Sequence, residues 1–130
     1  MICKLIMATA IKYAIPAFLL SAVIHQESNF NPLAVNKAAP VHSFGLGQLT
    51  MSTARQFCNL TRKTILNPEK NLDCSAKVLA YQLNRYNDLD KAISAYNAGS
   101  YTPKNKSYVN SVNDRVMENK CEVNNEDFAG

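Results

Sequence analysis

One carboxylic acid in this chain lies between an apolar run and a polar turn. Glu27 follows Ala22, Val23 and Ile24 and precedes the segment Ser28-Asn29-Phe30-Asn31-Pro32. A carboxyl group placed against apolar side chains is harder to ionise, so its pKa rises. A raised pKa suits a general acid, which must hold a proton near neutral pH. Taken alone, the segment favours a solvated glutamate near a helix end, because most glutamates are exposed.

Two further segments carry groups that could bind a polar ligand. In Ser43-Phe44-Gly45-Leu46-Gly47-Gln48-Leu49, two glycines allow a backbone to approach a partner closely, and Gln48 offers both a donor and an acceptor to an amide or a sugar hydroxyl. In Ala95-Tyr96-Asn97-Ala98-Gly99, the tyrosine offers an apolar face with a hydroxyl, and the asparagine offers paired hydrogen bonds. Each segment also has a structural interpretation, a helix start for the first and a glycine-capped helix end for the second.

Helices must position these three segments. The clearest apolar stripe consists of Leu72, Ala76, Leu79, Leu83 and Tyr86, which recur at steps of four and three. Neither a convincing strand alternation nor an internal repeat is present, so the sequence predicts an all-α fold. The expected helices cover 2–13, 17–27, 45–58, 72–86, 88–97 and 107–119, with proline or glycine punctuation at Pro16, Asn31-Pro32, Asn67-Pro68 and Gly99.

Length and charge limit the function classes. A chain of 130 residues with 47% hydrophobic residues forms one domain, which we place at 1–120, followed by a polar, flexible tail at 121–130. Residues 1–120 hold 14 basic and seven acidic residues, a net charge of +7. This basic body suits an anionic partner such as a cell-wall polymer, a nucleic acid or an acidic membrane, and a soluble surface of ordinary charge is the equally weighted alternative. The basic residues are scattered and never form a run of five, which argues against a nucleic-acid partner.

The cysteines and histidines show no metal-site spacing. Cys58 and Cys74 could close a short loop with a disulfide, and four reduced, partly buried thiols are the equally weighted alternative. Without a CxxC pair or an HExxH motif, we expect neither a metal nor another cofactor.

The apolar N-terminal stretch superficially resembles a signal peptide. Lys12 and Pro16 interrupt the run, no clean cleavage site follows, and cleavage near Ala22 would remove the helix that carries Glu27. We therefore expect residues 1–27 to belong to the folded domain, with no stable membrane insertion.

Five short segments in order make the sequence similar to the soluble lytic transglycosylase family, which has a goose-lysozyme-like fold. The similarity covers about residues 6–118. The segments are Glu27 to Ala34, Gly45 to Leu49 with Thr53-Ala54, Asn67-Pro68-Glu69-Lys70-Asn71-Leu72, Ala95 to Gly99, and Tyr108 to Val112. The resemblance implies a compact domain of about six helices around a catalytic cleft.

The resemblance also implies roles for individual residues. Glu27 is the single catalytic acid and base, and the substrate is peptidoglycan, cleaved between N-acetylmuramic acid and N-acetylglucosamine with formation of a 1,6-anhydro end. The expected substrate-binding residues are Gln48, Tyr96, Asn97, Ser43 and Tyr108. One departure is Gly47, which stands where the family usually has methionine and which we expect to loosen the wall of the cleft. No motif supplies a second carboxylate: Asp73, Asp88 and Asp90 are interpreted as helix-terminus charges.

Alternatives stay open at this point. A lysozyme-type hydrolase on the same fold, a non-catalytic wall-binding virion component and a weakly supported nucleic-acid binder are the rival functions. A bare catalytic domain suggests a monomeric bacteriophage protein, virion-borne or lytic, which acts on the wall in the periplasm. An exported bacterial periplasmic protein is the alternative source.

Overall fold

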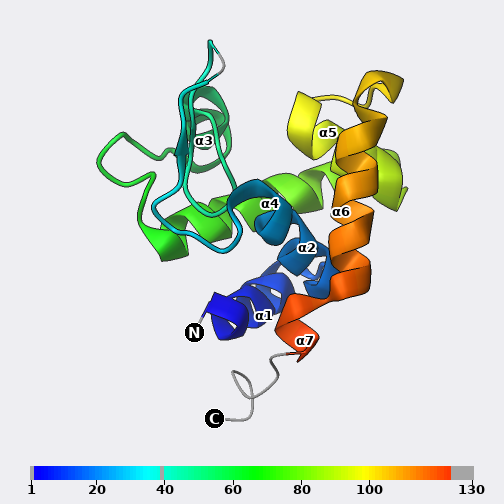
Figure 1. Cartoon of the computed structure of the whole chain (residues 1–130). Helices are drawn as coiled ribbons and strands as arrows, with labels where there is room; N and C mark the ends of the chain where they lie inside the picture. Colours follow the sequence, from blue (N-terminus) through cyan, green and yellow to red (C-terminus); the bar gives the residue numbers. More distant parts are fainter. Residues whose placement is uncertain (1, 39, 124–130) are drawn as a thin grey trace.

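The computed structural model describes residues 2–38 and 40–123. Within them, α-helices dominate, and a two-stranded antiparallel sheet and one short 3-10 helix are the remaining regular elements (Figure 1). The all-α expectation is thus confirmed. In chain order the elements are α1 (Ile2–Tyr13), α2 (Ala17–Ser28), β1 (Val35–Asn36), β2 (Ser43–Phe44), α3 (Met51–Cys58), α4 (Pro68–Tyr86), α5 (Leu89–Ala98), the 3-10 helix η1 (Pro103–Asn105), α6 (Lys106–Glu118) and α7 (Lys120–Val123).

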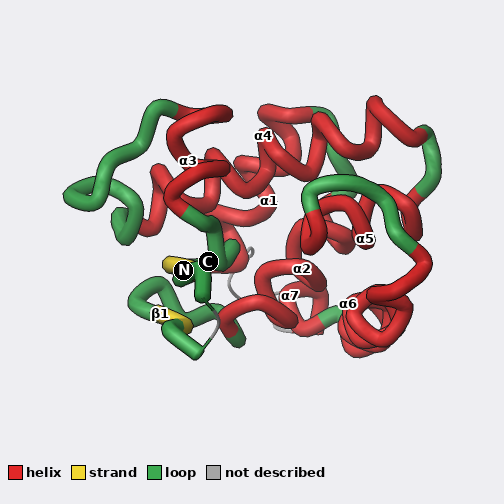
Figure 2. Tube along the Cα trace, turned by 90° about the horizontal axis from the view of Figure 1, so that it is seen from above, coloured by secondary structure: helices red, strands yellow, loops and turns green. Residues whose placement is uncertain are grey.

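The main core lies where α1, α2, α4, α5 and α6 meet. Leu20, Ile24, Leu79, Ile93 and Val112 are completely buried there, one or two from each of four helices. Burying each such side chain stabilises the fold by about 1.5–3 kcal/mol. Figure 1 shows the long α4 crossing the molecule, with α3 over one end and α5 and α6 at the other. Seen from above in Figure 2, α3 again lies on one side of the molecule and α5 and α6 lie on the other.

A second, smaller core holds α3 and its flanking loops against α4. Leu49, Ala54, Ile65 and Val78 are buried in it. The disulfide between Cys58 and Cys74 joins the end of α3 to α4, which is the disulfide alternative of the sequence analysis. The expected helix boundaries differ most from the observed ones in this region.

The helix expected over 45–58 begins only at Met51. Residues 43–49 instead form β2, which pairs with β1, and a turn closed by a bridge between Phe44 and Leu49. Gly45 and Gln48 have positive φ angles of 76° and 50°, which a right-handed helix cannot contain. Thr50 is the N-cap of α3, because its side chain accepts a hydrogen bond from the backbone N–H of Thr53, and the helix starts at the next residue.

The other expected helices agree with the structure within one residue at each end, except that α4 starts four residues earlier, at Pro68. Asn67 caps it by accepting from the Lys70 N–H, and proline suits the first turn. The sequence does not predict three features of the structure: the short strands, the 3-10 helix η1 and α7.

The C-terminal boundary needs correction at Cys121. The sequence predicts that this residue belongs to the polar tail, but it is buried in α7 and forms a disulfide with Cys3 of α1. Residues 124–130 of the expected tail lie outside the described residues. Among the described helices, none combines the length and the apolar character that a membrane span needs.

Candidate active site

Glu27 lies one residue before the C-terminal end of α2. The helix ends because Asn29 adopts the left-handed conformation and its backbone N–H donates a hydrogen bond to the His25 carbonyl. The buried run that precedes Glu27 anchors it in the core and leaves its side chain half-buried. This burial raises the pKa of the Glu27 carboxyl from 4.5 to about 7, although a hydrogen bond from Tyr108 acts in the opposite direction. The expected raised pKa is therefore present in the folded protein.

Tyr108 of α6 contacts this carboxyl directly. Its hydroxyl donates a hydrogen bond to Oε2 of Glu27, which is 81 positions away in the sequence. Burial raises the pKa of Tyr108 well above 10.0, and the charge of Glu27 and the hydrogen bond to it raise it further. The phenol therefore stays protonated and serves as a fixed donor to Glu27.

Tyr96 of α5 approaches the same carboxyl from another helix. Its hydroxyl donates to the backbone carbonyl of Gly47 at 2.8 Å. Burial raises the Tyr96 pKa first, and the nearby negative charge of Glu27 raises it further. Tyr96 thus lies within electrostatic reach of the acid and is hydrogen-bonded to the loop that contains Gly47 and Gln48.

A buried amide fixes this loop in place. Asn71 of α4 is fully buried, accepts from the Gly47 N–H at 2.9 Å and donates to the Phe44 carbonyl at 2.9 Å and to the Ile65 carbonyl at 2.8 Å. The sequence pattern predicts no role of its own for Asn71. A signal was present, since an amide next to Leu72 on a strongly apolar helix needs internal partners when buried.

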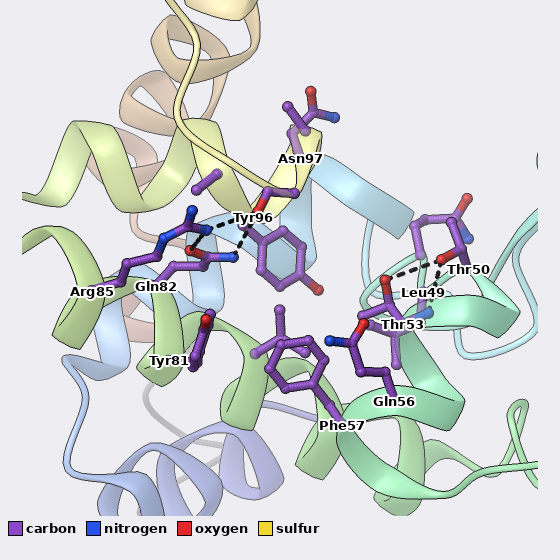
Figure 3. Close-up of a pocket in the computed structure, with 15 residues that line it drawn as sticks. Leu49, Thr50, Thr53, Gln56, Phe57, Tyr81, Gln82, Arg85, Tyr96 and Asn97 are labelled. Carbon is purple, nitrogen blue, oxygen red and sulfur yellow. Dashed lines mark hydrogen bonds between the residues drawn. The ribbon is translucent and has the colours of Figure 1, made fainter.

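A groove of about 410 Å³ begins at Tyr96 and extends between α3, α4 and α5 (Figure 3). Gln48 and Asn97 line it, as do Phe57, Tyr81 and further residues, whereas Glu27 itself is not among the lining residues. The Nε2 group of Gln48 donates to the Ala34 and Gly45 carbonyls, both at 3.1 Å, so this amide holds the loop as well as facing the groove. The lining residues are Gln48, Leu49, Thr50, Thr53, Gln56, Phe57, Val78, Tyr81, Gln82, Arg85, Ala95, Tyr96, Asn97, Ala98 and Gly99.

Comparison with known proteins identifies this arrangement. The sequence matches the family described as Transglycosylase SLT domain over residues 4–117, which is most of the chain. The chain belongs to the SLT domain family.

Relatives of this SLT domain include curated proteins from a phage and from a bacterium. It is 31% identical over 109 residues to the transglycosylase of Enterobacteria phage PRD1, covering 81% of this chain and 39% of the relative. It is 32% identical over 112 residues to the membrane-bound lytic murein transglycosylase C of Photorhabdus laumondii, covering 74% of this chain and 30% of the relative. The chain therefore spans less than half the length of either relative.

Solved structures share the fold of this SLT domain. An inactive mutant of the lytic transglycosylase Slt from Pseudomonas aeruginosa superposes with a TM-score of 0.76 at 19% identity, covering 93% of this chain and 24% of the other. A 70-kDa soluble lytic transglycosylase in complex with bulgecin A superposes with a TM-score of 0.67 at 22% identity, covering 86% and 19%. At this identity the likeness concerns the fold, and the fold expected from the resemblance is confirmed.

Gly47 does not leave a loose wall in this SLT domain, contrary to expectation. A Cβ atom built on Gly47 would overlap the side chain of Ser75 and lie 2.6 Å from the Tyr96 hydroxyl oxygen. Ser75 and Tyr96 therefore occupy the space beside this glycine. The position is closely packed, and no side chain larger than hydrogen fits without movement.

Three other carboxylates of the SLT domain are engaged elsewhere. Asp73 binds the Lys12 ammonium at 2.6 Å and the Tyr13 hydroxyl at 2.7 Å, in the interior of α4 and not at a helix end as expected. Asp88 caps α5 by accepting from the Lys91 N–H, and Asp90 accepts from the Asn113 amide. Across residues 2–38 and 40–123, no group of three or more potential ligands is arranged to hold a metal ion.

The remaining predicted site residues lie in different surroundings. Asn97 is exposed at the end of α5, and its Oδ1 atom accepts from the Asn105 amide at 3.0 Å. Ser43 lies in β2 opposite Asn36, outside the set of residues that line the groove, so its substrate contact stays a prediction. Tyr108 also lies outside that set and contacts Glu27 instead.

Proposed function

We propose that this SLT domain is a peptidoglycan lytic transglycosylase that cleaves the β-1,4 bond between N-acetylmuramic acid and N-acetylglucosamine. The observation that carries the proposal is Glu27, a half-buried carboxyl with a pKa of about 7 that receives a hydrogen bond from Tyr108 beside the groove. The relatives named transglycosylase and murein transglycosylase support the same reaction and substrate.

In the first step, protonated Glu27 donates its proton to the glycosidic oxygen. The bond between this oxygen and C1 of the muramic acid then breaks, and positive charge develops at C1. The substrate's own acetamido group helps to stabilise that charge. A pKa of about 7 leaves a substantial protonated fraction near neutral pH, so the acid is available for this step.

In the second step, the resulting carboxylate accepts the proton of the C6 hydroxyl while that oxygen attacks C1. The product is a 1,6-anhydromuramoyl end, no water is consumed, and Glu27 regains its proton. The attacking hydroxyl belongs to the same sugar ring, so its effective concentration is already high and the protein needs no second carboxylate. Consistent with this, none of the described residues that line the groove is acidic.

The other site residues take supporting roles in the proposal. Tyr108 positions the Glu27 carboxyl and stabilises its charged form through its hydrogen bond. Tyr96 lines the groove within electrostatic reach of this acid, and Gln48 and Asn97 present amide groups that can bind the sugar hydroxyl and acetamido groups. Ser43 is retained as a predicted substrate contact.

We further propose that the domain acts in a bacteriophage setting, as a virion-borne or lytic enzyme that works as a monomer on the wall in the periplasm. Its similarity to the transglycosylase of phage PRD1 supports this setting. Its similarity to a bacterial membrane-bound transglycosylase supports an exported periplasmic protein as the second candidate. The proposal includes no nucleic-acid partner and no stable membrane insertion.

Mass spectrometry of the products from purified sacculi tests the proposed function. We expect 1,6-anhydro products, each lighter by one water than the hydrolysed form. Products with hydrated reducing ends would identify a lysozyme-type hydrolase and contradict the proposal. Binding to sacculi without any cleavage would identify a wall-binding component, with Glu27→Gln serving as the inactive reference.

A further inference from the structure

The part of the groove beyond Tyr96 is neutral except at one residue. Along its α4 side the lining residues run from Val78 to Arg85, seven positions further on, a rise of about 10 Å along a helix. The aromatic rings of Phe57 and Tyr81, in edge contact at a centroid distance of 5.2 Å, line the same groove. Arg85 is the single charged residue among the described lining residues.

Several contacts hold the Arg85 guanidinium at the wall of the groove. Nη1 donates to the Gly99 carbonyl at 3.2 Å and to Oε1 of Gln82 at 3.5 Å (Figure 3). Nη2 donates to the Ser100 hydroxyl at 3.3 Å. The guanidinium also lies over the ring of Tyr86, 4.9 Å from its centroid. A guanidinium has five N–H donors, and these three bonds leave two of them, on Nε and Nη2, without an acceptor among the described residues.

The charge of Arg85 has no counter-ion within the part of the chain that the structure describes. Arg115 and Lys12 show the contrast, since they pair with Glu118 at 2.9 Å and Asp73 at 2.6 Å. For Arg85 no carboxylate lies within salt-bridge distance, counting the side chains of residues 2–38 and 40–121. A fixed guanidinium with free donors favours a planar anion, because it can bind two oxygens at once.

We propose that Arg85 binds a carboxylate of the substrate strand and thereby selects charged peptidoglycan over neutral glycan. The inference rests on the proposed function, and it adds a specificity-determining residue in the groove. Peptidoglycan offers two sources of this carboxylate. One is the lactyl group of muramic acid where the peptide is missing, and the other is the stem peptide where it is present. The sugars themselves carry none.

Binding to three defined strands tests this role. Cleavage of sacculi by the unmodified domain is measured first, because its absence would refute the proposed function and not the role of Arg85. Calorimetry then uses Glu27→Gln, which binds without turnover, and Glu27→Gln with Arg85→Gln. The ligands are stem-bearing strands, amidase-stripped strands with free lactyl carboxylates, and N-acetylglucosamine oligomers of equal length.

We expect Arg85→Gln to lower the affinity for the carboxylate-bearing strands by about tenfold and the affinity for the neutral oligomers by less than about twofold. If affinity falls only for the stem-bearing strands, the carboxylate that Arg85 binds belongs to the stem peptide. If it falls only for the stripped strands, that carboxylate belongs to the lactyl group. Arg85→Lys, which keeps the charge but not the planar fork, is expected to restore part of the affinity. Arg62→Gln, an exposed cation outside the groove, is the matched control and is expected to change neither.

Equal weakening of all three ligands by Arg85→Gln would show that the arginine holds the groove wall through Gly99 and Ser100, and would overturn the proposal. Unchanged affinity for every strand would overturn it as well. Raised salt supplies an independent readout: it should weaken binding of the charged strands to the arginine form more than to the glutamine form.

Discussion

Replacing Glu27 with glutamine should abolish wall cleavage and stabilise the fold at neutral pH. The pKa of the Glu27 carboxyl is about 7 in the folded protein against an ordinary value of 4.5. Between these two values the folded protein holds a proton that the unfolded chain has already released. Stability therefore falls as the pH rises through this window, and the loss is complete above pH 7.

The size of the effect follows from the two pKa values. A difference of about 2.5 corresponds to about 3 kcal/mol at 1.36 kcal/mol for each pKa unit. Glutamine has nearly the same shape, can still accept the hydrogen bond from Tyr108 and never ionises. We therefore expect Glu27→Gln to match the unmodified domain below pH 4 and to exceed its free energy of unfolding by up to about 3 kcal/mol at pH 8.

Urea denaturation followed by far-ultraviolet circular dichroism, at a series of pH values from 4 to 8, measures this difference. Cleavage of sacculi should fall by at least about a hundredfold in the same variant, because a positioned general acid contributes 10²- to 10⁴-fold. Glu69→Gln, a change at an exposed glutamate in the first turn of α4, is the control. This control substitution should change the free energy of unfolding by less than about 1 kcal/mol.

A stability gain of Glu27→Gln that is the same at pH 4 and pH 8 would contradict the ionisation argument. A loss of stability at pH 8 would contradict it more strongly, since the carboxylate would then be better accommodated than a neutral amide. Either result would also remove the reason to regard Glu27 as a proton donor near neutral pH.

Three further substitutions test neighbouring parts of the site. Tyr108→Phe removes the hydrogen bond that lowers the Glu27 pKa, so the alkaline limb of the pH–activity profile should move to higher pH while the maximal rate falls. Tyr96→Phe leaves the Gly47 carbonyl without its donor and should cost about 1 kcal/mol of stability but a larger share of activity; complete unfolding would instead assign Tyr96 to the core. Gly47→Ala should destabilise the domain by about 1–3 kcal/mol in thermal unfolding, and an unchanged melting temperature would contradict the close packing around this glycine.

The helices were predictable because their signals are local. The stripe from Leu72 to Tyr86 and the caps at Asn67 and Asp88 depend on neighbours within a few residues. The start of α3 was not predictable in the same way, because Gln48 adopts a positive φ angle and glutamine has no particular preference for that conformation. Tertiary contacts of the loop, above all with Asn71, decide that conformation.

The candidate acid was predictable, but the groups that regulate it were only partly so. The apolar run before Glu27 is the local signal for a raised pKa, but taken alone the segment favours a solvated glutamate, and the resemblance to the transglycosylase family selects Glu27 as the acid. The direct contact of Tyr108 with Glu27 joins two helices across 81 residues, and no local pattern reveals such a pairing. The same limitation applies to the disulfide between Cys3 and Cys121, which lie 118 positions apart.

The balance of forces on Glu27 explains how one carboxyl can serve both proposed steps. Burial favours the protonated acid that the first step needs, and the hydrogen bond from Tyr108 favours the carboxylate that the second step needs. Burial alone would place the pKa higher and make the carboxylate form scarce. An exposed glutamate would be ionised at neutral pH and could not donate. A pKa of about 7 makes both forms comparably populated near neutrality, so the same side chain can release a proton and take one back.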